Sequence, residues 1–74
     1  MTTMTGFENL ANAIVIQAAK DYTKALKMQK KHPHYDVAKA QIAELEDFFR
    51  SPWYHTLTSV DGEMLIKKLR EGVQ

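Results

Sequence analysis

A chain of 74 residues without cysteine has room for one small domain, and it excludes both a disulfide framework and cysteine-ligated zinc. Its 45% hydrophobic and 26% charged residues are typical of a globular protein. The formal net charge of +1 gives no argument from overall charge for binding nucleic acid or membrane. We expect one domain over residues 1–74, with residues 1–4 frayed.

Residues 6 to about 31 are predicted to form one long helix. Thr5-Gly6-Phe7-Glu8 has the form of a capping box, in which the Thr hydroxyl and the Glu carboxylate bond backbone N–H groups. Apolar residues then recur at the i, i+3, i+4 spacing of one buried face. Ile16 and Met28 lie off this stripe, so a second contact face is expected on the same helix. The apolar run Leu10 to Ala19 is about half of the ~20 residues that a membrane-spanning helix needs.

The second half of this helix is basic, and four of its lysines share one face by their spacing: Lys20, Lys24, Lys27 and Lys31. One interpretation is a solvated face, with cations at the negative end of the helix dipole. The other is a short stripe that contacts an anion or a nucleic acid. We favour the first.

A second helix is predicted from Val37 to about Arg50, after the turn His32-Pro33-His34 and with Asp36 as its N-cap. The short connection implies an antiparallel helical hairpin. Its acidic C-terminal part should then lie beside the start of the first helix, away from the lysines. Separate positive and negative zones of this kind would suit self-association. The acidic residues are Glu44, Glu46 and Asp47.

The aromatic stretch Phe48 to Tyr54 forms the corner between this helix and the next part of the chain. Ser51 is predicted as an N-cap and Pro52 as the first residue of a short helical turn. A final helix should follow, capped by Ser59 or Asp61 and ended by Gly72. The fold class is thus all-α, a small helical bundle. We expect its core to contain Leu10, Ile14, Ala18, Tyr22, Ile42, Leu45, Phe49, Trp53, Leu57, Leu65 and Leu69.

This arrangement of helix boundaries and aromatics resembles small uncharacterised proteins encoded by bacteriophages and prophages of Gram-positive bacteria. The resemblance is carried by 46–54, 57–58, 60–63 and 65–69, and by Ala13-Ile14-Val15, Ala18 and Asp21-Tyr22 near the start. It implies a phage-encoded accessory protein. Because the chain has no cysteine and Met1 to Thr5 lack the features of a signal peptide, we expect it in the cytoplasm of the host cell. The resemblance brings no assigned activity and no catalytic residues.

The residues themselves predict neither an enzyme nor a cofactor. His55 and Thr56 are adjacent, and helix neighbours point apart, so they do not form a nucleophile–base pair. The two histidines of the turn lack zinc-type spacing, and no metal site is predicted. We expect a non-enzymatic protein that binds a host or phage protein and forms a homo-oligomer through the long first helix.

The alternative function is binding of a nucleotide or a nucleic acid, including sequestration of a nucleotide signal. Arg50 could grip a phosphate, the helix start at Ser51 could receive an anion, and an aromatic face could stack a base. Helical spacing assigns Phe49 and Trp53 to the core, which leaves Phe48, Arg50 and Tyr54 at the rim of the corner as the candidate site. The lysine face of the first helix is the other candidate.

Overall fold

Residues 6–73 of the computed structural model are described here, and within them the chain is all-α. The helices are α1 (Gly6–Lys31), α2 (Asp36–Phe49), α3 (Pro52–Leu57) and α4 (Gly62–Val73), and no strand occurs in this part of the chain. The predicted fold class, a long helix in a hairpin with a second one followed by a short helical turn and a final helix, is confirmed.

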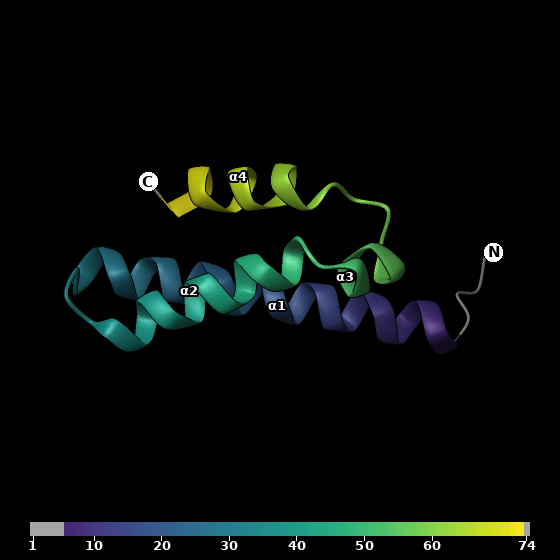
Figure 1. The fold of residues 1–74 in the computed structure, drawn as a ribbon, viewed down its shortest axis with the longest axis horizontal. Coiled ribbons are helices and arrows are strands. Elements are labelled where there is room, and N and C mark those ends of the chain that lie inside the picture. Colours follow the sequence, from purple (N-terminus) through teal and green to yellow (C-terminus); the bar gives the residue numbers. More distant parts are fainter. Residues whose placement is uncertain (1–5, 74) are drawn as a thin grey trace.

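The helices form two layers (Figure 1). α1 and α2 run antiparallel in one layer, and α4 packs lengthwise against both of them as the second layer. α3 packs near the N-terminal half of α1. α4 runs in the same general direction as α1, and Lys30 Nζ donates a hydrogen bond of 3.3 Å to the carbonyl of Val73 where both helices end. The molecule measures 46 × 25 × 19 Å, and its long axis is set by α1.

Most helix boundaries follow the expected local chemistry. Ser51 caps α3, because its Oγ accepts from the backbone N–H of Tyr54 at 3.2 Å, and Pro52 is the first helical residue. Asp61, the second of the two caps considered for the last helix, accepts from the N–H of Glu63 at 3.2 Å. The capping box at Thr5 lies outside the described residues.

Two predicted boundaries are wrong. Asp36 is the first helical residue of α2 and not its cap, because Tyr35 takes the N-cap position without bonding through its side chain. The Asp36 carboxylate therefore lies in the first turn, where it interacts favourably with the positive end of the helix dipole. Gly72 does not end α4, which continues to Val73, and no described glycine has positive φ.

Three aromatic side chains form the centre of the core. Tyr22 of α1, Phe49 at the end of α2 and Tyr54 of α3 are fully buried, and Phe49 meets each of the others edge to face, at 5.5 and 5.7 Å between ring centroids. Such pairs add about 0.5–1.5 kcal/mol beyond the area that they bury. Of the predicted core, Ala18, Tyr22, Ile42, Phe49 and Leu57 are buried, and Ile14, Leu45, Leu65 and Leu69 are half-buried.

Leu10 and Trp53 are the two wrong members of the predicted core. Leu10 is 61% exposed because α2 ends beside the middle of α1, so only the short α3 covers the first turns of α1. Trp53 is 52% exposed because α3 turns Tyr54 and Leu57, three residues apart, toward the core. Tyr54 therefore takes the buried position that was assigned to Trp53.

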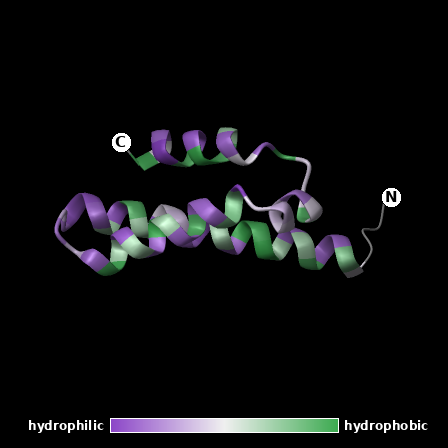
Figure 2. Ribbon diagram, viewed as in Figure 1, coloured by the Kyte–Doolittle hydropathy of each residue, from purple (hydrophilic) through white to green (hydrophobic). Residues whose placement is uncertain are grey.

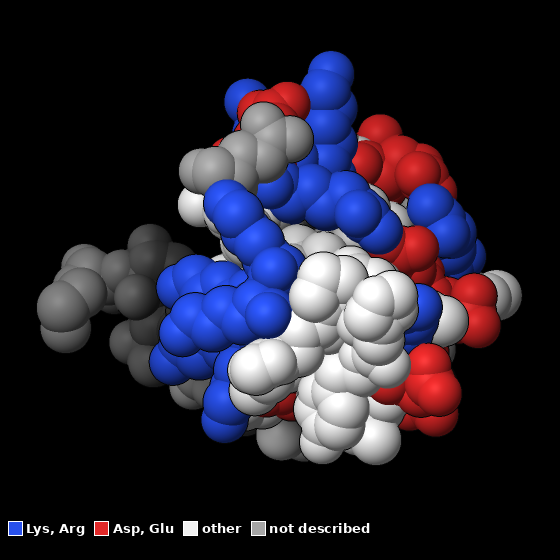
Figure 3. Space-filling view, turned by 90° about the vertical axis from the view of Figure 1, so that its left-hand side faces the viewer, with Lys and Arg blue, Asp and Glu red and all other residues white. Residues whose placement is uncertain are grey.

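The acidic end of α2 also lies elsewhere than predicted. Glu46 bonds Tyr22, which is in the middle of α1, so this end is beside the middle of α1 and not beside its start. The charges are nevertheless segregated when the molecule is viewed from the hairpin turn (Figure 3). Lysine and arginine gather on the left and at the top of that view, and aspartate and glutamate lie mainly on the right, with some basic side chains among them.

Candidate binding surfaces

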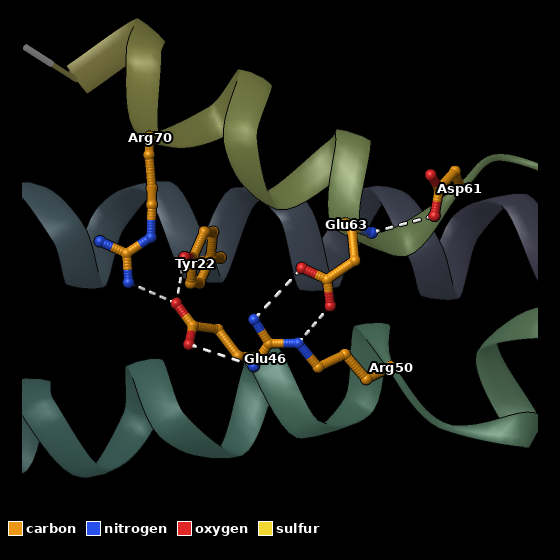
Figure 4. Close-up of polar contacts among 6 residues, drawn as sticks. All are labelled: Tyr22, Glu46, Arg50, Asp61, Glu63 and Arg70. Carbon is orange, nitrogen blue, oxygen red and sulfur yellow. Dashed lines mark hydrogen bonds and ion pairs between the residues drawn. The ribbon is translucent and has the colours of Figure 1, made fainter.

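The predicted ligand site at the Arg50 corner is occupied by ion pairs (Figure 4). Arg50 Nε donates to Glu63 Oε1 at the start of α4, and Nη2 donates to Glu63 Oε2 at 3.4 Å. Arg50 Nη1 also lies 3.6 Å from Glu46 Oε1, one turn earlier in α2. The guanidinium thus joins α2 to α4, although it remains about half exposed.

Glu46 is the centre of this network and joins three helices. Its Oε2 accepts a hydrogen bond of 2.5 Å from the hydroxyl of Tyr22 on α1 and another from Arg70 Nη2 on α4. Arg70 lies 5.9 Å above the Tyr22 ring centroid, in a cation–π arrangement. The sequence analysis placed Glu46 only in the acidic part of its helix, and the structure gives it a bonded, half-buried position.

The network shifts the ionisation of its members. Burial, with the hydrogen bond and the negative charge of Glu46, raises the pKa of Tyr22 to about 12. Burial alone would raise the pKa of Glu46, but the hydrogen bonds from Tyr22 and Arg70 and the charges of Arg70 and Arg50 together lower it. Glu46 is therefore held as a carboxylate and Tyr22 as a neutral phenol.

The remaining residues of the corner differ in accessibility. Tyr54 was expected at the rim, but it is fully buried, and its hydroxyl has no hydrogen-bond partner among the described residues. Burial, and then the negative charge of Asp61, raise the pKa of Tyr54. Phe48 is half-buried, and its ring meets that of Tyr54 edge to face at 5.8 Å between centroids. Of the three candidate residues, Arg50 and Phe48 keep exposed surface, and they lie on different sides of α2.

Phe48 contributes to a groove between α1 and α2, which we call the open groove. It has a volume of about 550 Å³ and is lined by Ala13, Ile14, Gln17, Ala18, Asp21, Leu45 and Phe48. Leu45 and Phe48 lie on the opposite side of α2 from Glu46 and Arg50, which face α4, so α4 leaves this side of the hairpin uncovered. Its lining is mostly apolar, and the Asp21 carboxylate accepts a 2.9 Å hydrogen bond from Gln17.

The apolar surface continues beyond the open groove along the start of α1. Phe7 and Leu10 precede Ile14 at helical spacing and are 58% and 61% exposed. Hydrophobic residues are accordingly seen along the N-terminal half of α1, which extends past the end of α2 (Figure 2). We call Phe7, Leu10 and the open groove together the open face.

Three of the four predicted lysines line a second groove, between α1 and α4. This basic groove, of about 430 Å³, is lined by Ile16, Ala19, Lys20, Thr23, Lys24, Lys27 and Leu69. Lys31 is exposed but is not part of the lining. Ile16 and Met28, expected to share a second contact face, are both exposed but line different hollows, since Met28 lies with His32 and Tyr35 at the hairpin turn.

Sequence reasoning did not identify either groove. The open groove includes Ile14, Ala18 and Leu45, which the spacing had assigned to the buried core. The basic groove needs Leu69 from the far end of the chain. Among residues 6–73, no three His, Asp or Glu side chains are grouped so that they could hold a metal ion. Within the same residues, no helix has the length and apolar character needed to cross a bilayer.

No protein-family model matches the chain, and neither a curated protein nor a solved structure matches it.

Proposed function

We propose that the protein is a non-enzymatic binding protein that assembles as a homodimer through its open face and acts by binding a partner protein. The open face is the observation that carries this proposal. It leaves Phe7, Leu10 and Ile14 of one helix exposed or half-exposed, next to an apolar groove. Contiguous apolar surface of this kind on a small protein is typical of an interface.

A second copy is the occupant that this face fits best. Phe7 and Leu10 project on the same side of α1 as the groove that begins at Ile14, so one surface carries both a ridge and a hollow. A surface with both features is self-complementary under a two-fold axis, which sets the ridge of each copy in the hollow of the other. Two α1–α2 hairpins would then form a four-helix bundle, with α4 on the outside of each.

Charge also favours a second copy on this face. Asp21 is the one ionisable residue lining the open groove, and Gln17 already bonds its carboxylate. Three lysines of α1 line the basic groove, which is a separate hollow. Two open faces can therefore approach with one ionisable side chain from each groove, Asp21, and with the lysines of the basic groove kept away from the contact.

The non-enzymatic part of the proposal follows from how the titratable groups with shifted pKa are used. Tyr22, Glu46 and Arg70 bond one another across three helices, and Arg50 bonds Glu63. These contacts and burial account for the pKa shifts of the five groups, and burial accounts for most of the raised pKa of Tyr54. The resemblance to phage-encoded accessory proteins adds the proposal that the partner protein belongs to the host or to the phage.

Nucleotide or nucleic-acid binding is the second candidate, and the lysines of the basic groove are the observation that favours it. The version that uses the corner has less support, because Tyr54 is buried and Arg50 is paired with Glu63. A phosphate ligand there would have to displace that carboxylate.

Site-specific cross-linking tests the homodimer, since the chain has no cysteine of its own. Ala13→Cys places one thiol on the open face, and Ala43→Cys places one on an exposed position of α2 outside both grooves. We expect a short bis-maleimide to join Ala13→Cys into covalent dimers at micromolar protein and to leave Ala43→Cys without a covalent cross-link. Equal yields from the two variants, or none from either, would contradict the proposal.

A further inference from the structure

We infer that the basic groove binds an acidic amphipathic helix of a partner protein. This inference names the partner class for the protein-binding function proposed above and rests on that function. It uses a surface distinct from the open face, so the two can be tested separately. Ile14 lines the open groove and Ile16 lines the basic groove, although only Val15 lies between them in the sequence.

The floor of the basic groove is apolar. Ile16 is 53% exposed, and Ala19 and Leu69 are half-buried beside it. Thr23 contributes little polarity, because its hydroxyl donates a 3.0 Å hydrogen bond to the carbonyl of Ala19 in the preceding turn. A ligand for this groove must therefore bring an apolar surface of its own.

The edge of the basic groove is cationic. Lys20, Lys24 and Lys27 are exposed, and the ion pairs of residues 6–73 are formed by Arg50 and Arg70 without them. Their i, i+4, i+7 spacing places the three ammonium groups along about 10 Å of α1, or two helical turns. Carboxylates at the same spacing on an approaching helix would meet all three.

The combination of floor and edge selects among anionic ligands. A nucleotide phosphate would leave the apolar side chains of the floor in contact with water. The lining also contains no aromatic ring on which a base could stack and no arginine for a bidentate phosphate contact. An amphipathic helix satisfies both parts, because its apolar stripe covers Ile16 and Leu69 while its acidic flank pairs the lysines. Lysine stems also add apolar contact area while their charged ends stay in water.

Fluorescence anisotropy with a designed peptide tests this inference. The probe is a labelled 14-residue helical peptide with leucine at i, i+3 and i+7 and glutamate on one flank. Its two controls replace every glutamate by lysine or every leucine by serine. We expect the wild-type protein to bind the acidic amphipathic peptide and neither control, with affinity falling as salt rises.

Matched variants locate the binding. Lys24→Glu in the basic groove should weaken binding of the peptide by about tenfold or more, and tenfold corresponds to about 1.4 kcal/mol. Lys39→Glu is an equal charge change at an exposed position of α2, and it should change the affinity for the peptide by less than about twofold. Ile16→Ser should weaken it in the same way as Lys24→Glu, and circular dichroism checks that each variant is folded.

Three results would overturn the inference. The peptide fails to bind, Lys24→Glu and Lys39→Glu weaken it equally, or a 12-nucleotide single strand binds more tightly than the peptide and is lost in Lys24→Glu. Failure of the open-face proposal gives a different pattern. In that case Ala13→Cys does not cross-link, while the peptide still binds to a monomer.

Discussion

The hydroxyl of Tyr22 on α1 donates a 2.5 Å hydrogen bond to the carboxylate of Glu46 on α2, and Arg70 on α4 donates to the same oxygen. One carboxylate thus fixes the positions of three helices relative to one another. In a domain this small the apolar core alone supplies little stability, so a bonded carboxylate at its edge contributes a large share of the free energy of unfolding. The network also sets the exposed faces of α1 at a fixed angle to α4, which defines the basic groove.

Glu46→Gln is expected to destabilise the fold by about 2 kcal/mol, because hydrogen bonds to charged groups contribute about 1.5–3 kcal/mol. The amide keeps the size of the side chain but loses the charge that Arg70 and Arg50 face. Urea unfolding followed by circular dichroism measures the difference. Glu44→Gln is the matched control on an exposed position of the same helix, and it should change stability by less than about 0.5 kcal/mol. Equal effects of the two substitutions would disprove the role of Glu46.

Stability should depend on pH at both ends of the range. The folded-state pKa of Glu46 is lowered, so its contribution is present above the unfolded-state pKa and is lost as the pH falls through the folded value. The pKa of Tyr22 is raised to about 12, so its contribution is present below about 10 and is lost as the pH rises from 10 to 12. Thermal unfolding measured between pH 2 and 12 follows the loss of stability at both ends of the range. Glu46→Gln should reduce the loss of stability at low pH, and Tyr22→Phe should reduce the loss at high pH. Unchanged losses in these variants would contradict the roles given to Glu46 and Tyr22.

Gly62 is required by a close approach and not by its backbone conformation. A Cβ built at this residue would lie 2.0 Å from the carbonyl oxygen of Phe49, which is a backbone atom and cannot rotate away. Gly62→Ala should therefore separate α4 from α2 and destabilise the protein by about 3 kcal/mol, as overpacking in a core does. Gly72→Ala in the same helix has open space around the new methyl and should stabilise by about 0.5–1 kcal/mol. Urea unfolding of the two variants tests this contrast, and a neutral Gly62→Ala would contradict it.

The helices could be predicted from sequence because their signals are local. The apolar spacing along α1 and the Ser51-Pro52 pair at α3 act within one or two turns. The exchange of Trp53 and Tyr54 could not be predicted, because a helix of six residues is too short for spacing to fix which side faces the core. Both are aromatic, and the choice depends on where Phe49 and Gly62 place the end of α2 against α4.

The pairs that define the surfaces depend on contacts between distant parts of the chain. Glu46 lies 24 residues from both Tyr22 and Arg70, and Arg50 lies 13 residues from Glu63. Glu46 borders the apolar stripe of α2, four residues after Ile42 and three before Phe49, but this spacing does not show which side chains of α1 and α4 it meets. The exposure of Leu10 depends in the same way on where α2 ends relative to α1.

Sedimentation equilibrium of the wild type beside two isoleucine variants tests the proposed assembly most directly. We expect the wild-type protein to have twice the 8.5 kDa mass of the chain at micromolar concentration. Ile14→Asp, in the open groove, should be a folded monomer, and Ile16→Asp, in the basic groove, should remain a dimer. A wild-type protein that stays monomeric up to millimolar concentration, or a dimer that Ile14→Asp leaves intact, would contradict assembly through the open face.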